Sequence, residues 1–521
     1  NVTGLLVGEH RISTGTQFRA QKNFELDVLD QLDAGVTDNA VATGSDFVPS
    51  INLGLVGRVN YDYRTKYLAE FSFRYDGSSL FPRESRWGFF PGFSLAWRLS
   101  EEPFFKDRIS FVNQFKLRLS RGVMGDDAAA SGFEYLPGYI YPATTSGLTS
   151  YLFSANTLIT GAEAKGLVNK NITWYTSTTT NFGIEIDILR SLLFTQIDIF
   201  QRKRDGLLAT RAASLPSEFG ASFPQENLNS DKSIGFEIEL GHKKVVSNDF
   251  DYSITGNFTW ARSKWLYREV APYGSSYSKW RNDASYRWKN MRWGYGFVGQ
   301  FQNQEEINTS PSQNANGHAA LFPGDVRYED WNGDGMISEL DMFPAGRDNN
   351  AEIFYGLDFS ARYKGFALTV FFQGAANYTL LPTAQMRGPL MWGRNSIDIF
   401  MDRWHHEDPL DFSTPWVPGK FPISRTNFGY PPNQLVSEYT LQDIWYVRLK
   451  NAELSYTLPA RWTTKFYVQR LRIFANGTNI FTIKSKEAFF DPEKRLDGSE
   501  AQSGYKYPLM KNYNLGIDIT F

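Results

Sequence analysis

The sequence predicts an all-β protein, a transmembrane antiparallel β-barrel, and three observations support this. Segments of about ten residues alternate apolar and polar side chains, which is the period of a strand and about the length that crosses a bilayer. Tight turns alternate with long connections, as in barrels with one short-turn rim and one long-loop rim. Aromatic residues make up 16% of the chain, and many stand at strand ends, where a membrane interface favours them. Aromatic packing in a soluble sheet is the alternative.

The composition excludes several kinds of partner, site and membrane protein. The 521 residues carry a formal net charge of −2, so nothing points to nucleic acid as a partner. The chain has no cysteine, which excludes disulfides, thiolate metal sites and cysteine nucleophiles. No apolar run approaches the roughly 18 residues of a transmembrane helix. No signal peptide precedes the first strand-like run, although a mature exported chain would lack one too.

The strand-like segments follow one another along the whole chain. In "KYLAEFSFRYDGS" (66–78) the alternation puts Tyr67, Phe71 and Tyr75 on one face and Glu70 and Arg74 on the other. Further segments with this period are 51–64, 87–99, 180–189, 193–204, 233–243, 251–263, 353–363, 366–374, 443–458, 470–483 and 512–521.

This pattern also predicts which side chains face lipid. We expect Phe71, Ile186, Ile199 and Leu368 to point outward at bilayer depth. If residues 292–302 stay outside the membrane, the count is about 14 strands, an even number as bacterial barrels prefer.

The connections divide into two sets. Tight turns are expected at 63–66, 190–192, 243–249, 363–365 and 458–466. Long outer loops are expected near 13–50, 124–173, 205–230, 265–350, 376–440 and 483–510.

One motif has metal-binding character. "DWNGDGMISELD" (330–341) has the spacing of a calcium loop, with side-chain oxygens and one carbonyl where a hard cation needs them. The predicted ligands are Asp330, Asn332, Asp334, the carbonyl of Met336, and Asp341. Gly335 stands where such a loop needs a positive φ, and Ile337 where a short β contact forms. We expect structural calcium here, with a metal-free Asx/Gly turn as the alternative.

Other candidate sites are weaker. His405 and His406 are adjacent, so their side chains point apart in an extended chain, and a solvated loop is the preferred interpretation. Aromatic-rich outer segments at 133–142, 273–293 and 391–406 suit sugar stacking, peptide packing or a partner protein, so no substrate-binding residue is assigned. No catalytic constellation stands out, and we expect a protein that is not an enzyme.

Several motifs together resemble a known family. "RYDGSSLFPRESRWGFFPGFSLAWRLSEEPFF" (74–105), "PGDVRYEDWNGDGMISELD" (323–341), "YKGFALTVFFQG" (363–374), "DPE" (491–493) and the terminal "YNLGIDITF" are similar to stretches of SusC/RagA-type TonB-dependent outer-membrane transporters of Bacteroidetes. Residues 1–521 resemble the C-terminal part of such a barrel.

The resemblance implies a function and partners. Barrels of this family have about 22 strands and an N-terminal plug, and this sequence shows only about two thirds of the strands and no plug-like region. It implies a bacterial outer-membrane importer of nutrients, in first place of oligosaccharides, with a SusD-like surface lipoprotein as a lid. Coupling to the TonB complex would run through the N-terminal part. Import of oligopeptides, a non-transporting barrel-based receptor or adhesin, and a secreted β-sheet glycosidase are the alternatives.

Overall fold

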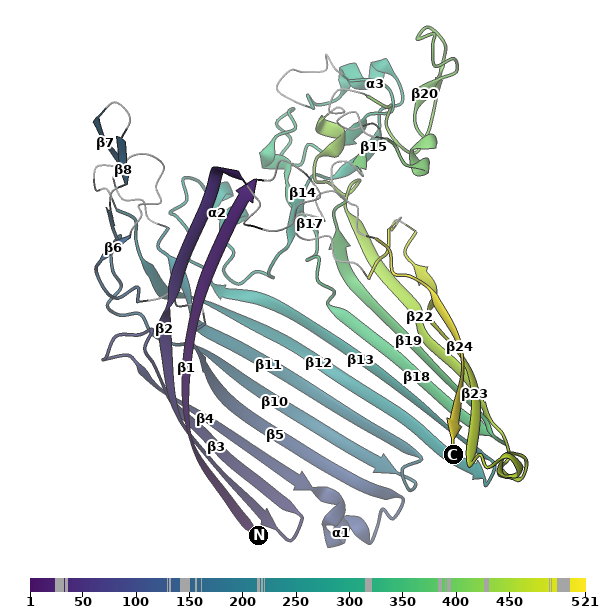
Figure 1. Cartoon of the computed structure of the whole chain (residues 1–521). Helices are drawn as coiled ribbons and strands as arrows, with labels where there is room; N and C mark the ends of the chain where they lie inside the picture. The colour runs from purple at the N-terminus through teal and green to yellow at the C-terminus, as the bar shows by residue number, and fades with distance from the viewer. Residues whose placement is uncertain are drawn as a thin grey trace.

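The computed structural model describes residues 1–23, 32, 36–128, 130, 133–140, 150–154, 157–160, 162–212, 216, 219, 221–313, 321–382, 387–388, 390, 395–425, 431–486, 488, 490–493 and 507–521. Within these ranges, fourteen strands form one antiparallel sheet in which each strand pairs with its sequence neighbours in the sheet. Figure 1 shows the strands side by side from β1 and β2 to β24, with most of the further elements beyond their upper ends and α1 at the lower ends.

The sheet strands are long, as expected for strands that cross a bilayer. They are β1 (Val2–Asn23), β2 (Val36–Tyr63), β3 (Tyr67–Ser78), β4 (Trp87–Arg98), β5 (Val112–Asp126), β10 (Tyr175–Ile188), β11 (Leu193–Thr210), β12 (Gln225–Ser247), β13 (Phe250–Tyr267), β18 (Ile353–Tyr363), β19 (Phe366–Leu380), β22 (Gln442–Thr457), β23 (Arg470–Lys484) and β24 (Asn512–Thr520).

The remaining elements are short and lie in the connections. The strands are β6 (Tyr139–Ile140), β7 (Ser150–Ser154), β8 (Thr157–Thr160), β9 (Glu163–Ala164), β14 (Arg292–Gly294), β15 (Phe297–Gln300), β16 (Val326–Tyr328), β17 (Phe343–Gly346), β20 (His405–His406) and β21 (Trp416–Val417). The helices are α1 (Pro103–Lys106), α2 (Ser276–Asn282), α3 (Gln304–Thr309) and α5 (Ala460–Thr463), with 3-10 turns η2 (Leu99–Glu101), η4 (Glu339–Asp341), η6 (Asp398–Met401), η7 (Pro431–Gln434) and η8 (Thr464–Phe466). Within the described ranges, no helix is long and apolar enough to cross a membrane.

The strand register sorts the side chains into two faces. Side chains of directly paired residues lie on the same face of a sheet. One row runs Leu117, Ile184, Ile197, Ile238, Phe258 across β5, β10, β11, β12 and β13. The next row, on the opposite face, runs Arg118, Gly183, Asp198, Glu237, Thr259. We call these the apolar outer face and the polar inner face.

The lipid-face expectation agrees with this register. Ile186 stands two residues from Ile184 on β10, and Ile199 pairs with Phe182, so both lie on the outer face. Phe71 pairs with Phe93 and is 42% exposed. Leu368 pairs with Leu454, also on the outer face.

The turns on the lower rim are short at most positions. β2 and β3 are joined by residues 64–66, β10 and β11 by 189–192, and β18 and β19 by 364–365. The expected turn at 243–249 is wrong in extent, because β12 continues to Ser247 and only two residues separate it from β13. Figure 1 places α1, in the β4–β5 connection, on this lower rim.

The expected outer loop at 13–50 is wrong over most of its length. β1 and β2 continue as a paired ribbon from Ser13↔Ser50 to Ala20↔Ala42, beyond a bulge, and Figure 1 shows this ribbon rising above the sheet. Residues 13–23, "STGTQFRAQKN", lack the apolar alternation, because a two-stranded ribbon outside the membrane needs no lipid face. The expected loop at 205–230 is shorter too, since β11 reaches Thr210 and β12 begins at Gln225.

Residues 292–302 stay outside the sheet, as predicted. They form β14 and β15, which pair with β17 and β16 in two small sheets. The sheet is therefore even-stranded in the described part of the chain, and its edges are β1 and β24.

The face assignment predicts an asymmetric response to arginine on β10. Ile186→Arg should place a charge on the lipid-facing side of β10 and destabilise the protein by up to about 2–4 kcal/mol, the range for the bilayer midplane, with a smaller cost nearer the lower rim. Asn181→Arg, on the inner face of the same strand, should assemble normally. The measurement is urea-dependent unfolding of the membrane-assembled protein by gel mobility, and equal stability of the two variants would contradict the assignment.

Candidate functional site: the inner wall and the outer mouth

Charged residues on neighbouring strands meet on the inner face. Arg118 on β5 lies with its Nε 2.7 Å from Oε1 of Glu185 and its Nη2 3.1 Å from Oδ1 of Asp198. Gly183 stands between them, and a Cβ there would lie 2.8 Å from Nη2 of Arg118. Because glycine has no side chain, the Arg118 guanidinium can cross β10 at this position and reach Asp198 on β11.

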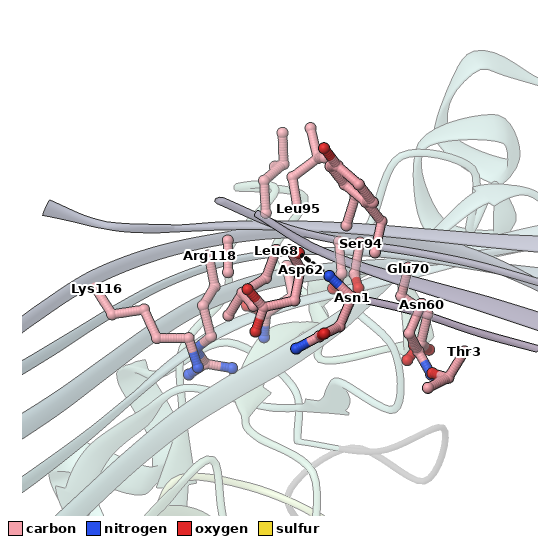
Figure 2. A pocket seen from close by; sticks show the side chains of 16 residues that line it. Asn1, Thr3, Asn60, Asp62, Leu68, Glu70, Ser94, Leu95, Lys116 and Arg118 are labelled. Carbon is pink, nitrogen blue, oxygen red and sulfur yellow. Dashed lines mark hydrogen bonds between the residues drawn. The ribbon is translucent and has the colours of Figure 1, made fainter. Parts of the chain in front are cut away.

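A pocket opens on the same wall. It has a volume of about 650 Å³ and is lined by residues of β1 to β5 and β10. Figure 2 shows Lys116, Arg118, Asn60 and Glu70 on one side of the strands, while Leu95 points to the other. Such a wall of mixed charges and amides is suited to a hydrated passage and to reversible contacts with polar solutes.

The upper end of the inner face carries a second charged group. Arg448 on β22 lies 2.7 Å from Asp491 and 2.6 Å from Glu493, with its side chain only 5% exposed. The hydroxyl of Tyr378 on β19 donates to the carbonyl of Pro492 at 2.7 Å. Because Arg448 pairs across the sheet with Gln373 on the inner face, these contacts hold residues 490–493 against the inner side of β19 and β22.

The carboxyl of Asp491 has a lowered pKa. Burial acts to raise this pKa, but hydrogen bonds from the backbone N–H of Leu509, from Arg448 and from the N–H of Glu493 outweigh it. The stabilisation is therefore present at neutral pH and is lost as the pH falls through the lowered pKa.

Above the sheet, the β13–β18 and β19–β22 connections pack together, and we call their described residues the outer module. Its central residue is Asp325, which is fully buried and accepts hydrogen bonds from Asn433 Nδ2 at 2.7 Å and from Arg425. Gly324 has φ +91°, and a Cβ there would lie 2.3 Å from the Trp404 ring. The "PGD" triplet thus joins two connections that are about 100 residues apart in sequence.

The calcium-type loop, residues 330–341, lies in the outer module. Gly335 has φ +84°, as predicted. The N–H of Ile337 donates to the carbonyl of Ser312 at 2.7 Å, which is the short β contact expected at this position. The N–H of Gly335 donates to Oδ2 of Asp330 at 2.8 Å, so the backbone turns around that first carboxylate.

The side chains of the loop bond to its own backbone. Asp341 is fully buried; its Oδ1 accepts from Trp331 N at 2.9 Å and its Oδ2 from Ser338 N at 2.7 Å. Oδ1 of Asp334 accepts from Met336 N at 2.9 Å, and Nδ2 of Asn332 donates to Asp334 at 3.0 Å.

These observations bear on calcium in two ways. The backbone has the form that a calcium loop requires. Among the described residues, however, no three His, Cys, Asp or Glu side chains converge as a metal group. Asp341 is turned toward backbone amides instead. Oδ1 of Asp341 also accepts from Asn332 N at 3.2 Å, and Oδ1 of Asp330 accepts from the N–H groups of Gly333 and Asp334, so both lone pairs of these two oxygens are used. The residues fit an ion only if the Asp341 side chain turns away from these amides.

The loop is fixed to α2 by aromatic and polar contacts. The Trp331 ring stacks on Trp280 with centroids 5.4 Å apart. Tyr277 Oη and Arg281 Nη1 donate to the carbonyl of Glu339 at 2.9 and 2.8 Å. A change in the loop would therefore reach the 273–293 segment directly.

The histidines differ from the expectation of a solvated loop. His406 is 7% exposed, its Nδ1 lies 2.7 Å from the carbonyl of Thr414, and its ring lies 3.9 Å from the Trp416 ring. The short β20–β21 pairing buries it, and this explains why the expectation was wrong for His406. Of the aromatic segments 133–142 and 391–406, residues 141–142 and 391–394 lie outside the described residues.

The contacts of Arg448 and Asp325 were not predicted. The "DPE" and "PGD" triplets contain Asp491, Glu493 and Asp325, but the partners Arg448 and Asn433 carry no signal in the sequence that identifies the pairing.

Comparisons with known proteins agree with this architecture. A family model described as TonB dependent receptor-like, beta-barrel matches residues 1–378. TonB-dependent receptor P26 of Formosa agariphila is 28% identical over 490 residues, covering 89% of this chain and 46% of that protein. TonB-dependent receptor SusC of Bacteroides thetaiotaomicron is 26% identical over 478 residues, covering 89% of this chain and 43% of that protein. The chain thus spans about half the length of these curated relatives.

A solved structure has the same fold. The RagAB peptide importer in its closed-closed state matches with a TM-score of 0.74 at 18% identity, covering 100% of this chain and 53% of that one.

The Arg448 contacts predict an anchor for residues 490–493. Arg448→Met removes the buried cation and leaves the Asp491 carboxylate unpaired, which typically costs about 3–5 kcal/mol. We expect faster protease cleavage within 485–511 while the sheet stays assembled. Arg83→Met, an exposed change on the upper rim, is the control, and unchanged cleavage of Arg448→Met would contradict the anchor.

Proposed function

This chain belongs to the TonB-dependent receptor-like β-barrel family, and from that premise we propose that it forms most of the wall of an energy-coupled importer. Proteins of this family lie in the bacterial outer membrane. The proposed cargo is a nutrient too large for simple diffusion, in first place an oligosaccharide.

The polar inner face is the observation that carries this proposal. Its charges are paired across strands, as Arg118 with Asp198 and Arg472 with Asp518, so the wall is hydrophilic without exposing many single charges. A barrel that serves only as a membrane anchor needs no such continuous polar wall up to its mouth.

The proposed partners follow from the position of the outer module. A SusD-like surface lipoprotein would cover the mouth, and the TonB complex would act through parts of the protein outside these 521 residues. Outer-membrane lipid contacts the apolar outer face.

The nature of the cargo has two candidates. RagAB is described as a peptide importer, which supports oligopeptides as the alternative to oligosaccharides. A receptor or adhesin that binds but does not transport is the second alternative function. Neither proposal assigns this chain a catalytic role.

We further propose that the calcium-type loop binds one calcium ion with a structural role. Asp330, Asn332, Asp334, the carbonyl of Met336, and Asp341 would supply only oxygen ligands, which suits calcium. The ion would hold the outer module in the shape that receives the lid. The support is the backbone of the loop: the φ of Gly335 and the β contact of Ile337.

Import is tested with the full-length gene. Cells with the gene, cells without it, and gene-bearing cells treated with a protonophore receive fluorescent malto-, xylo- and galacturono-oligosaccharides or a mixed peptide digest. We expect internal label that needs both the gene and the proton gradient. Surface label that survives the protonophore, with no internal label for any probe, would identify a receptor instead.

Calcium binding is tested at Asp334. Asp334→Ala removes a central carboxylate and should weaken or abolish calcium binding. Protease protection of residues 305–350 should therefore no longer respond to calcium. The barrel should still assemble, while the lid should bind more weakly. Glu305→Ala, an exposed acid on α3, is the control. Equal protease protection of the wild type with calcium and with chelator would contradict calcium binding and favour the metal-free Asx/Gly turn.

A further inference from the structure

A second pocket lies in the outer module, next to the upper end of the inner face. Its volume is about 430 Å³, and it is lined by residues of the 265–293 stretch, among them Trp265, Trp288 and Trp293. Trp265 pairs with Asp231, which pairs with Arg204 on the inner face. The pocket therefore borders the mouth of the passage.

The pocket carries positive charge that is not paired with any acid in the described part of the chain. Three arginines line it, Arg268, Arg281 and Arg287. In the part of the chain that the structure describes, no carboxylate forms an ion pair with any of them, whereas Arg118, Arg204 and Arg448 all have such pairs. An unneutralised cluster of three cations attracts an anion.

Of the acids near the pocket, one is paired with other cations and two do not contact the three arginines. Asp231 is bonded to Arg204 and to Lys289, so this acid and its two cations leave a further positive charge beside the pocket. The carboxylates of Asp283 and Asp348 accept hydrogen bonds from Ser285 N at 2.9 Å and from Asn290 Nδ2 at 2.7 Å. Both acids keep their negative charge, and neither forms an ion pair with the three arginines in the described part of the chain.

Two of the guanidinium groups are held in place by the protein. Arg281 Nη1 donates to the carbonyl of Glu339 at 2.8 Å, and Arg287 donates to the carbonyls of Trp280 and Arg281. Both also lie over the Trp293 ring, each with its Cζ 5.6 Å from the centroid. Such contacts orient a planar guanidinium without compensating its positive charge. An oriented, uncompensated guanidinium suits bidentate binding of carboxylate or sulfate.

Two backbone segments that border the pocket, at residues 263–265 and 287–289, are paired with each other. Trp265 N donates to the carbonyl of Arg287 at 2.9 Å, and Lys289 N donates to the carbonyl of Ser263 at 2.8 Å. An extended peptide is usually recognised through such main-chain groups, and here they are paired with one another. Recognition would depend on charges and on indole rings, against which sugar rings can pack.

We propose that this pocket binds the carboxylate or sulfate groups of acidic oligosaccharides as they reach the mouth. The inference rests on the proposed import function and specifies its cargo. Arg268 is the most open of the three cations: it is exposed and its Cζ lies 5.6 Å from the Trp265 ring centroid. It would make the first contact, and Arg281 and Arg287 would bind the anion more deeply.

The test is calorimetric titration of the purified full-length protein with tetragalacturonate, a sulfated chondroitin tetrasaccharide, neutral maltotetraose and tetraglutamate. We expect both acidic sugars to bind at least about tenfold tighter than maltotetraose, since charge-assisted bonds are about twice as strong as neutral ones. Arg268→Gln and the double variant Arg268→Gln/Arg287→Gln should lose that preference, and added salt should weaken it. Arg83→Gln, on the same rim, should keep it.

The outcomes separate the pocket from the import proposal. No preference for acidic sugars, or a preference unchanged in Arg268→Gln, overturns the pocket. Tighter binding of tetraglutamate than of either acidic sugar overturns the assignment to glycans. Binding of acidic sugars by the wild type without their uptake by cells would retain the pocket and overturn import.

Discussion

The structure depends on the pairing of its strands, along which successive side chains alternate between the two faces of the sheet. In hydrocarbon, an unpaired backbone N–H or C=O group costs several kcal/mol, so strands in the membrane bond to their neighbours. Within this sheet, every strand except the edge strands β1 and β24 does so on both sides. Pairing fixes the register, and the register decides which face each side chain occupies. The row of Leu117, Ile184 and Ile197 on one face and the row of Arg118 and Asp198 on the other follow from that one constraint.

The same constraint explains why the outer module is built differently. Above the membrane, water satisfies the backbone, and the elements are short strands and single helical turns. Their positions are fixed by individual buried polar contacts instead, such as those of Asp325 with Asn433 and Arg425. Each contact joins segments distant in sequence, so a few side chains determine the shape of the mouth while the wall below is insensitive to them.

The sequence predicted the wall well and the mouth poorly, for physical reasons. Alternation across residues such as Phe71, Ile186 and Ile199 reports a strand between lipid and water, so strand positions and faces could be predicted. Residues 13–50 were wrongly predicted as loop because a ribbon in water lacks that alternation. Within the calcium-type loop, Gly335 and Ile337 were predicted correctly because their roles are local. The hydrogen bonds of Asp341 and the burial of His406 depend on tertiary contacts, which no local pattern records.

The central claim is that one face of this sheet is a water-filled wall of a passage and the other meets lipid. The most direct measurement compares two single-cysteine variants at adjacent positions of β10, Asn181→Cys and Phe182→Cys, in the assembled full-length protein in membranes. A small water-soluble maleimide should label the Asn181→Cys variant readily and the Phe182→Cys variant at least about tenfold more slowly, because hydrocarbon shields the outer face and keeps the thiolate from forming. Equal labelling of the two variants, or faster labelling of Phe182→Cys, would contradict the account.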